Sequence, residues 1–168
     1  MDIGVKCDAE GALADWGAGA RRAAIGHAGI GEKQREGDRL TPIGRWGLRR
    51  VLYRADRIAK PASGLPVAAI ARDWGWCDAP DDANYNRQVI LPYPARAERL
   101  WRDDALYDVI VVAGYNDDPV VPGKGSAIFL HVAAAGYAPT EGCVAMALQD
   151  VLDAVAQLRP GDALVVTA

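Results

Sequence analysis

The sequence predicts a mainly β domain with a small helical contribution, and three observations carry this prediction. The 18 glycines and 10 prolines are scattered rather than repeated, which indicates many turns and short strands. Several short apolar runs are rich in β-branched residues, as strands are. Only one long segment has helical periodicity. A length of 168 residues with 51% hydrophobic and 24% charged composition predicts one globular domain, residues 1–168.

The N-terminal half is expected to hold a hairpin, a long loop and one strand. Segments 3–6 and 12–16 flank a turn-like tetrapeptide and predict the hairpin. Glycines recur among charged residues from Gly26 to Gly44, which predicts a loop that leads into a strand at 45–54. The following stretch, 60–94, contains five prolines and is expected to be extended and irregular.

The C-terminal half is expected to supply the core strands and the main helix. Continuous apolar runs at 108–115, 126–132 and 163–167 predict three strands. Apolar residues recur at helical spacing over 148–158, and Pro160-Gly161 ends the pattern, so this segment is the expected helix. A second, shorter helix is expected over 95–101.

Composition excludes several classes of partner. The formal net charge of -3 and the isoelectric point near 5.3 offer no general attraction for nucleic acid or for an anionic membrane surface. The apolar runs are shorter than the roughly 20 residues that span a bilayer, so no membrane span is expected. The N-terminus lacks the basic and apolar regions of a secretory signal, so no signal peptide is visible in this chain.

The three cysteines, Cys7, Cys77 and Cys143, are too few for a disulfide framework and too dispersed for a zinc ribbon. No metal site is expected, because His27 also lies at no ligand-like spacing from them. If Cys143 is a free nucleophile, Cys7 and Cys77 either pair with each other or remain two separate buried thiols. The sequence leaves that choice open.

One segment carries a pattern with chemical meaning: an apolar strand that ends in His131, a loop, and then Thr140-Glu141-Gly142-Cys143. Cysteine attacks as a thiolate, and a histidine on a neighbouring strand can take its proton. Gly142 leaves room for a substrate carbonyl and lets the N–H groups of Gly142 and Cys143 form an oxyanion hole. Thr140 orders the turn through its hydroxyl or donates to the substrate. A buried cysteine beside a satisfied histidine is the inert alternative.

The stretch Gly125–His131, followed by Thr140–Val144, resembles the motif of the L,D-transpeptidase catalytic domain: a histidine, a spacer, then Ser/Thr-x-Gly-Cys. Further segments resemble the same family and extend the resemblance from about Gly26 to the C-terminus. These segments are Arg35-Glu36-Gly37-Asp38, Thr41-Pro42-Ile43-Gly44, Trp74-Gly75-Trp76-Cys77-Asp78, Tyr85-Asn86 and Gly114-Tyr115-Asn116.

The resemblance implies a β-sandwich-like catalytic domain with one or two helices. It also implies acyl transfer: Cys143 attacks a peptidoglycan peptide stem, releases a D-amino acid and holds the stem as a thioester, which the amine of an acceptor stem resolves. His131 would be the base, oriented by a backbone carbonyl. The implied partners are donor and acceptor stems, no metal or organic cofactor is implied, and the location would be periplasmic or cell-wall associated.

Two departures from the commoner motif resemble a short single-domain branch of the family. The spacer between His131 and Cys143 is short, and Ala145 stands where Asn or Arg is frequent. In that branch some members form 1,3 rather than 3,3 cross-links, and both linkages stay open here. Tyr115 and Asn116 are the candidate substrate-binding residues, with core packing and turn capping as the alternative for each.

Two rival functions remain open at this point. Water instead of an amine would resolve the same thioester in an L,D-carboxypeptidase or peptidoglycan hydrolase. A non-catalytic cell-wall binding domain would hold Cys143 buried and inert. The sequence also leaves the export route and the oligomeric state undetermined.

Overall fold

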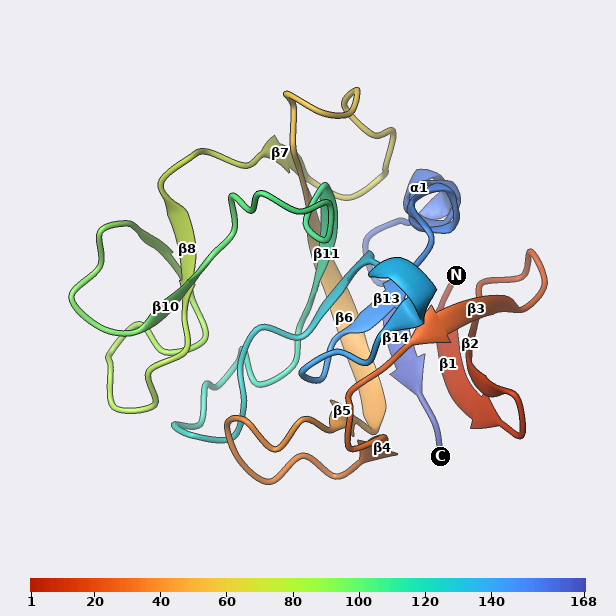
Figure 1. Ribbon diagram of the computed structural model, residues 1–168, viewed down its shortest axis with the longest axis horizontal. Coiled ribbons are helices and arrows are strands. Elements are labelled where there is room, and N and C mark those ends of the chain that lie inside the picture. The colour runs from red at the N-terminus through yellow and green to blue at the C-terminus, as the bar shows by residue number, and fades with distance from the viewer.

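The computed structural model describes all 168 residues and confirms the mainly β prediction (Figure 1). Besides the strands, it contains one α-helix, α1 (Leu148–Gln157), and one short 3-10 helix (Ala135–Tyr137). The strands are β1 (Ile3–Asp8), β2 (Gly11–Asp15), β3 (Arg21–Ala24), β4 (Ile30–Gly31), β5 (Thr41–Pro42), β6 (Gly44–Tyr53), β7 (Val67–Ala69), β8 (Trp74–Cys77), β9 (Gln88–Ile90), β10 (Ala97–Arg99), β11 (Val109–Ala113), β12 (Phe129–Val132), β13 (Val144–Met146) and β14 (Ala163–Val166).

The main sheet closes on itself. Its strand order is β11-β12-β13-β3-β2-β1-β14-β6-β7, and β6 pairs with β11 as well. The first half of the long strand β6 pairs with β14, and its second half pairs with β11 on one side and β7 on the other. Eight strands therefore form a continuous ring, and β7 extends it at β6. Closure leaves no unpaired edge between neighbouring strands of the ring.

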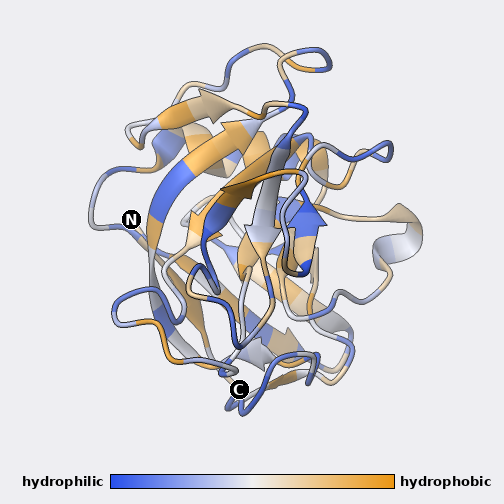
Figure 2. Cartoon of the chain, turned by 90° about the vertical axis from the view of Figure 1, so that its left-hand side faces the viewer, coloured by the Kyte–Doolittle hydropathy of each residue, from blue (hydrophilic) through white to orange (hydrophobic).

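The apolar core strands are buried on both faces. In β11, Val109 and Val111 belong to a large cluster inside the ring, whereas Ile110 and Val112 belong to a second cluster on its outer face. This arrangement explains the continuous apolar run at 108–115, since both faces of the strand are covered. Helix α1 adds Val151, Ala154 and Val155 to the inner cluster. Figure 2 shows hydrophobic residues concentrated in the strands and hydrophilic ones in the loops.

A small three-stranded sheet, β10-β8-β9, covers the outer face of the ring (Figure 1). Trp76 of β8 packs edge-on against Phe129 of β12, with ring centroids 5.1 Å apart, and Tyr107 packs against the same ring at 5.9 Å. The outer cluster also contains Cys143. The residue expected to be the nucleophile thus lies at the junction between the ring and the small sheet.

The expected hairpin, the core strands and the main helix are confirmed, but the second helix is wrong. Segment 95–101 contains strand β10, which pairs antiparallel with β8 through Ala97 and Cys77. Pairing with a distant strand decides the conformation of so short a segment, and its sequence alone does not. The strand expected from residue 126 begins at Phe129, because Gly125 and Ala127 have positive φ.

The three thiols are all free, so Cys7 and Cys77 do not pair. Cys7 is exposed on β1, whereas Cys77 is buried at the end of β8. None of the helices is long and apolar enough to cross a membrane.

Candidate active site

Strands β12 and β13 bring His131 and Cys143 to one face of the ring. The two strands are parallel, with His131 opposite Ala145, and Cys143 directly precedes β13. The Phe129 N–H donates to Cys143 Sγ at 3.3 Å, so the cysteine lies beside Phe129. Because side chains alternate along a strand, Phe129 and His131 point to the same face. The local sequence therefore delivers thiol and imidazole to the same surface.

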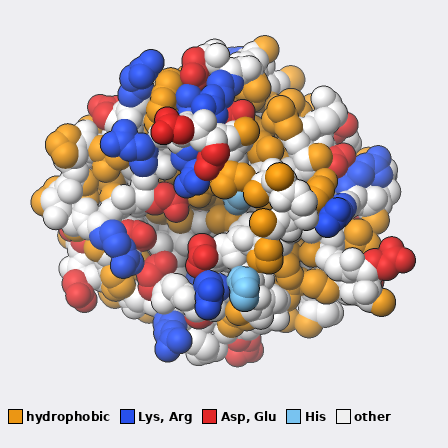
Figure 3. Space-filling model, viewed as in Figure 1, with side chains coloured by type: hydrophobic (Ala, Val, Ile, Leu, Met, Phe, Trp, Pro, Cys, Tyr) orange, Lys and Arg blue, Asp and Glu red, His pale blue; other side chains and the backbone are white.

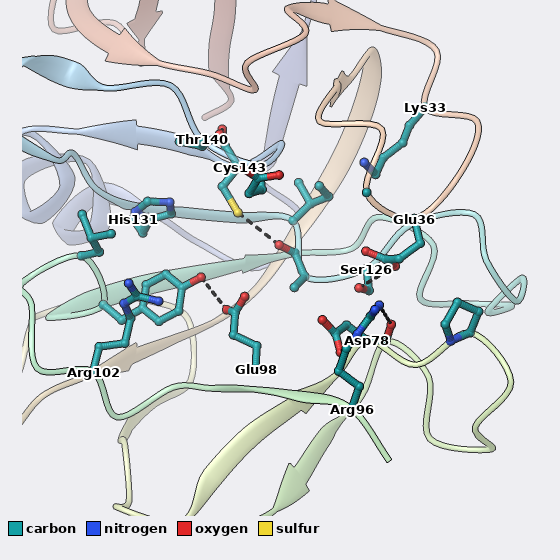
Figure 4. A pocket seen from close by; sticks show the side chains of 17 residues that line it. Lys33, Glu36, Asp78, Arg96, Glu98, Arg102, Ser126, His131, Thr140 and Cys143 are labelled. Carbon is teal, nitrogen blue, oxygen red and sulfur yellow. Dashed lines mark hydrogen bonds and ion pairs between the residues drawn. The ribbon is translucent and has the colours of Figure 1, made fainter.

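Both side chains line a cleft of about 620 Å³ between the ring, the small sheet and the loop before β5. Figure 3 shows acidic and basic side chains gathered around a hollow on this face of the molecule. In Figure 4, Cys143 lies in the middle of the cleft, with His131 on one side and Ser126 on the other. The charged residues that line the cleft are Lys33, Glu36, Asp78, Arg96, Glu98, Arg102 and Glu141.

His131 is held by the backbone and by an aromatic ring. Its Nδ1 lies 2.8 Å from the Val132 carbonyl oxygen, so Nδ1 carries the proton and Nε2 is left as the acceptor. The ring of Tyr107 packs edge-on against the imidazole at 5.3 Å. Burial lowers the pKa of His131 to about 4. The imidazole is therefore neutral at pH 7, which is the form that a general base requires.

Cys143 rests as a neutral thiol. Its Sγ donates to the Ala127 carbonyl at 3.1 Å, and burial raises the pKa of the thiol to about 12 (Figure 4). No hydrogen bond joins the thiol to His131 in this arrangement. For His131 to take the thiol proton, the Cys143 side chain would have to turn from the Ala127 carbonyl towards Nε2.

Thr140 orders the turn before Cys143. Its hydroxyl accepts the Gly142 N–H at 3.1 Å and donates to the Cys143 carbonyl at 2.6 Å. The Gly142 N–H is therefore occupied within the turn. Of the two expected oxyanion donors, the Cys143 N–H is the one that has no partner in the protein.

Leu40, just before β5, and Thr41, the first residue of β5, pack against the same turn. Gly142 has φ +136°, and a Cβ atom there would lie 2.8 Å from the Leu40 carbonyl oxygen, so only glycine fits. The buried Thr41 hydroxyl accepts the Gly26 N–H at 2.8 Å and donates to the Gly142 carbonyl at 2.9 Å. Residues more than 100 positions apart thus fix the backbone next to Cys143.

Tyr115 and Asn116 lie outside the cleft that holds Cys143. Tyr115 is 4% exposed, packs edge-on against Trp46 at 5.0 Å and belongs to the inner core. Asn116 has φ +50°, and its side-chain amide donates to the Gly125 carbonyl at 2.9 Å. Both residues border a separate hollow of about 320 Å³. Core packing and turn capping therefore describe them, and the expected contact with substrate at the Cys143 cleft is not supported.

Three further residues, Glu98, Arg102 and Tyr107, line the His131 end of the cleft and were not predicted from the sequence. Tyr107 donates its hydroxyl hydrogen bond to Glu98 of β10, and Arg102 lies over the Tyr107 ring at 5.1 Å. No motif marks them, and the segment that carries Glu98 was expected to be helical. No group of three or more His, Cys, Asp or Glu side chains comes close enough together to hold a metal ion.

A family model described as YkuD, the L,D-transpeptidase catalytic domain, matches residues 12–166. The chain belongs to this family. No curated protein and no solved structure matches the chain. The match runs from β2 to the last strand, so it includes the whole cleft around His131 and Cys143. As an L,D-transpeptidase domain, the chain has a type of catalytic domain that acts on the peptide stems of peptidoglycan.

Proposed function

We propose that this protein cross-links peptidoglycan peptide stems through a thioester on Cys143, as an L,D-transpeptidase. The observation that carries the proposal is the placement of Cys143 and a neutral His131 on one face of one cleft, inside a domain of this family. The proposed place of action is the periplasm or the cell wall, where the stems lie.

The reaction is proposed to begin when a donor stem enters the cleft and displaces the Ala127 carbonyl from the thiol. Nε2 of His131 then takes the thiol proton, and Sγ attacks the stem carbonyl. The Val132 carbonyl stabilises the imidazolium through Nδ1–H. The Cys143 N–H donates to the oxyanion. Collapse breaks the C–N bond, and the departing D-amino acid takes the proton from His131.

The acceptor amine completes the cycle. It attacks the thioester carbonyl, the C–S bond breaks, and the Cys143 thiolate recovers a proton. Water performs the same step in the rival L,D-carboxypeptidase or hydrolase, and the open cleft admits it. The resting thiol, with its raised pKa and its bond to Ala127, is the observation that favours the non-catalytic binding domain.

The deciding experiment is mass spectrometry of the protein incubated with disaccharide-tetrapeptide. The wild type is expected to show a thioester adduct and a dimeric product, whose fragments distinguish a 3,3 from a 1,3 linkage. Cys143→Ala is expected to show neither. His131→Ala is expected to lose activity by a factor of about 10²–10⁴, the usual contribution of a general base. Cys7→Ser, which removes an exposed thiol, is the matched control and should retain the activity.

Each other outcome identifies a rival. A dimer formed by Cys143→Ala would refute the cysteine mechanism. Trimmed monomer alone, formed by the wild type and not by Cys143→Ala, would identify the carboxypeptidase or hydrolase. An unchanged substrate that still binds the protein would identify the non-catalytic domain.

A further inference from the structure

Glu98 is a cleft carboxylate that lacks an ion pair. Its Oε1 accepts the Tyr107 hydroxyl, and no Lys or Arg nitrogen lies within salt-bridge distance. Arg102 lines the same end of the cleft but is paired with Asp104 at 2.6 Å. By contrast, Asp78 in the same cleft pairs with Arg96 at 3.0 Å. Glu98 therefore has no ion-pair partner of its own in the protein.

Burial makes this arrangement unfavourable until a cation arrives. Burial raises the pKa of Glu98, and the hydrogen bond from Tyr107 and the charge of Arg102 only partly oppose that effect. A carboxylate removed from water without a partner carries a desolvation cost that an ion pair offsets. A ligand that brings a positive charge to this end of the cleft would supply the missing partner.

Glu98 also lies at the catalytic end of the cleft. Tyr107 lies between Glu98 and His131: its hydroxyl donates to Glu98, and its ring packs against the imidazole of His131 at 5.3 Å. In Figure 4, Glu98 lies across the cleft from Cys143, between Arg102 and the pair formed by Asp78 and Arg96. A substrate group held by Glu98 would therefore face Cys143 across the cleft.

A second base at this place would let the acceptor amine react in the protonated form in which it arrives. An alkyl amine resembles the lysine side chain, whose pKa is about 10.4, so it arrives as an ammonium ion and cannot attack. It must lose one proton before attack and another as the amide forms. His131 takes one of these, which leaves the other without an acceptor among the residues already assigned.

We propose that Glu98 binds the ammonium group of the acceptor stem and takes its first proton. This inference rests on the proposed transpeptidase function. The ammonium N–H breaks and Glu98 becomes a carboxylic acid. The free amine attacks the thioester carbonyl, and its second proton passes to His131. The C–S bond breaks, His131 returns that proton to the Cys143 thiolate, and Glu98 releases its proton to solvent.

Glu36 is the other cleft glutamate that merits comparison. It also lacks an ion pair, but its Oε2 accepts hydrogen bonds from the hydroxyls of both Tyr85 and Ser126. It lies with Ser126 on the side of Cys143 away from His131 (Figure 4). This oxygen of Glu36 therefore holds the loop through two hydrogen bonds, whereas Glu98 accepts a single hydrogen bond and is freer to bind a cation.

The test separates formation of the thioester from its attack by amines. Glu98→Gln keeps the shape and an acceptor for Tyr107 while it removes the charge. The acyl-enzyme is formed with a donor stem and then mixed at pH 7 with an acceptor stem, whose amine is protonated, or with methoxyamine, which is neutral. Glu10→Gln is the matched control, because Glu10 is an exposed carboxylate outside the cleft.

Glu98→Gln is expected to slow attack by the acceptor stem at least tenfold, while acylation and attack by methoxyamine change less than threefold. Glu10→Gln is expected to change all three rates less than threefold. Glu98→Asp restores the charge one methylene further back and should recover part of the lost rate. Circular dichroism verifies that each variant is folded.

The pH profile gives a second readout. The charged or titratable groups that interact with Glu98 are the same in the wild type and in Glu98→Gln. They are Tyr107, Arg102, Asp78, Glu36 and Cys143. The rate of Glu98→Gln with the acceptor stem should rise tenfold per pH unit, as only free amine reacts, whereas the wild type should depend on pH less steeply.

Equal losses with both amines, or an equal loss in acylation, would overturn the role of Glu98 while the transpeptidase function stands. A wild type that forms no thioester would overturn both proposals.

Discussion

At the scale of single residues, burial sets the protonation states of both candidate catalytic side chains. The pKa of His131 falls from 6.5 to about 4, so between these values the unfolded chain binds a proton that the folded protein does not. The free energy of unfolding therefore has its full value above pH 6.5. It falls as the pH falls towards 4, because the unfolded chain gains the proton on His131 first. The free energy of unfolding should decrease by about 3 kcal/mol across this window.

Urea denaturation between pH 4 and 7 measures this dependence. His131→Gln should show a much shallower slope than the wild type, because the titrating group is gone. Asp38, whose pKa is lowered to about 2, acts below this window and does not confuse the comparison. An identical slope in both proteins would show that other groups cause the pH dependence.

The candidate site was predictable from sequence only where its residues form a local motif. His131 and Cys143 are 12 positions apart on consecutive segments of chain, and parallel pairing of β12 with β13 aligns them. Glu98 and Tyr107 reach the same cleft through the small sheet and the loop after it, so no spacing in the sequence links them to Cys143. Tyr115 and Asn116 also belong to a matching segment, yet they border the separate hollow and not the cleft of Cys143, so their role in substrate binding stays a prediction.

At the scale of elements, strand β5 supports the turn before Cys143 through its first residue, Thr41. Thr41→Val removes the hydroxyl at nearly constant shape and leaves the Gly26 N–H and the Gly142 carbonyl without partners. Two unsatisfied buried groups should lower the free energy of unfolding by about 2–4 kcal/mol. The rate of thioester formation should fall as well, since the turn next to Cys143 loosens.

Urea denaturation and the rate of adduct formation by mass spectrometry measure the two effects. Thr41→Ser keeps the hydroxyl and is the control, with a loss of about 1 kcal/mol for the missing methyl group. If Thr41→Val matched Thr41→Ser in both measurements, the two hydrogen bonds would not hold the turn.

The elements found from sequence are those with a strong pattern of their own. The hairpin, the apolar strands and α1 each show a period or a run that burial explains. Strands β3, β7, β8, β9, β10 and β13 have three or four residues each and show no such pattern. Their conformation comes from pairing with strands that are distant in the sequence, for which no local signal exists.

At the scale of the whole molecule, β14 joins the two ends of the chain and helps to close the ring. It pairs parallel with β1 and antiparallel with β6, and Leu164 lies opposite Ile3 on one side and Trp46 on the other. The Met1 ammonium also pairs with Asp162 at 2.5 Å, just before this strand. The last strand is therefore required for the continuity of the barrel-like core.

Leu164→Ala is expected to destabilise the entire domain. Leu164 is fully buried in the inner cluster, so its truncation should cost about 2–5 kcal/mol. Strands β11 and β12 each contribute side chains to both the inner and the outer cluster. The small sheet should therefore unfold together with the ring. Far-UV circular dichroism and tryptophan fluorescence, followed in urea, should therefore shift by the same amount. Val165→Ala, at a half-buried position of the same strand, is the control and should lose less stability. Trp16 and Trp46 report on the inner cluster, and Trp76 reports on the outer one. Two separate transitions in the fluorescence would therefore show that the ring and the small sheet unfold separately.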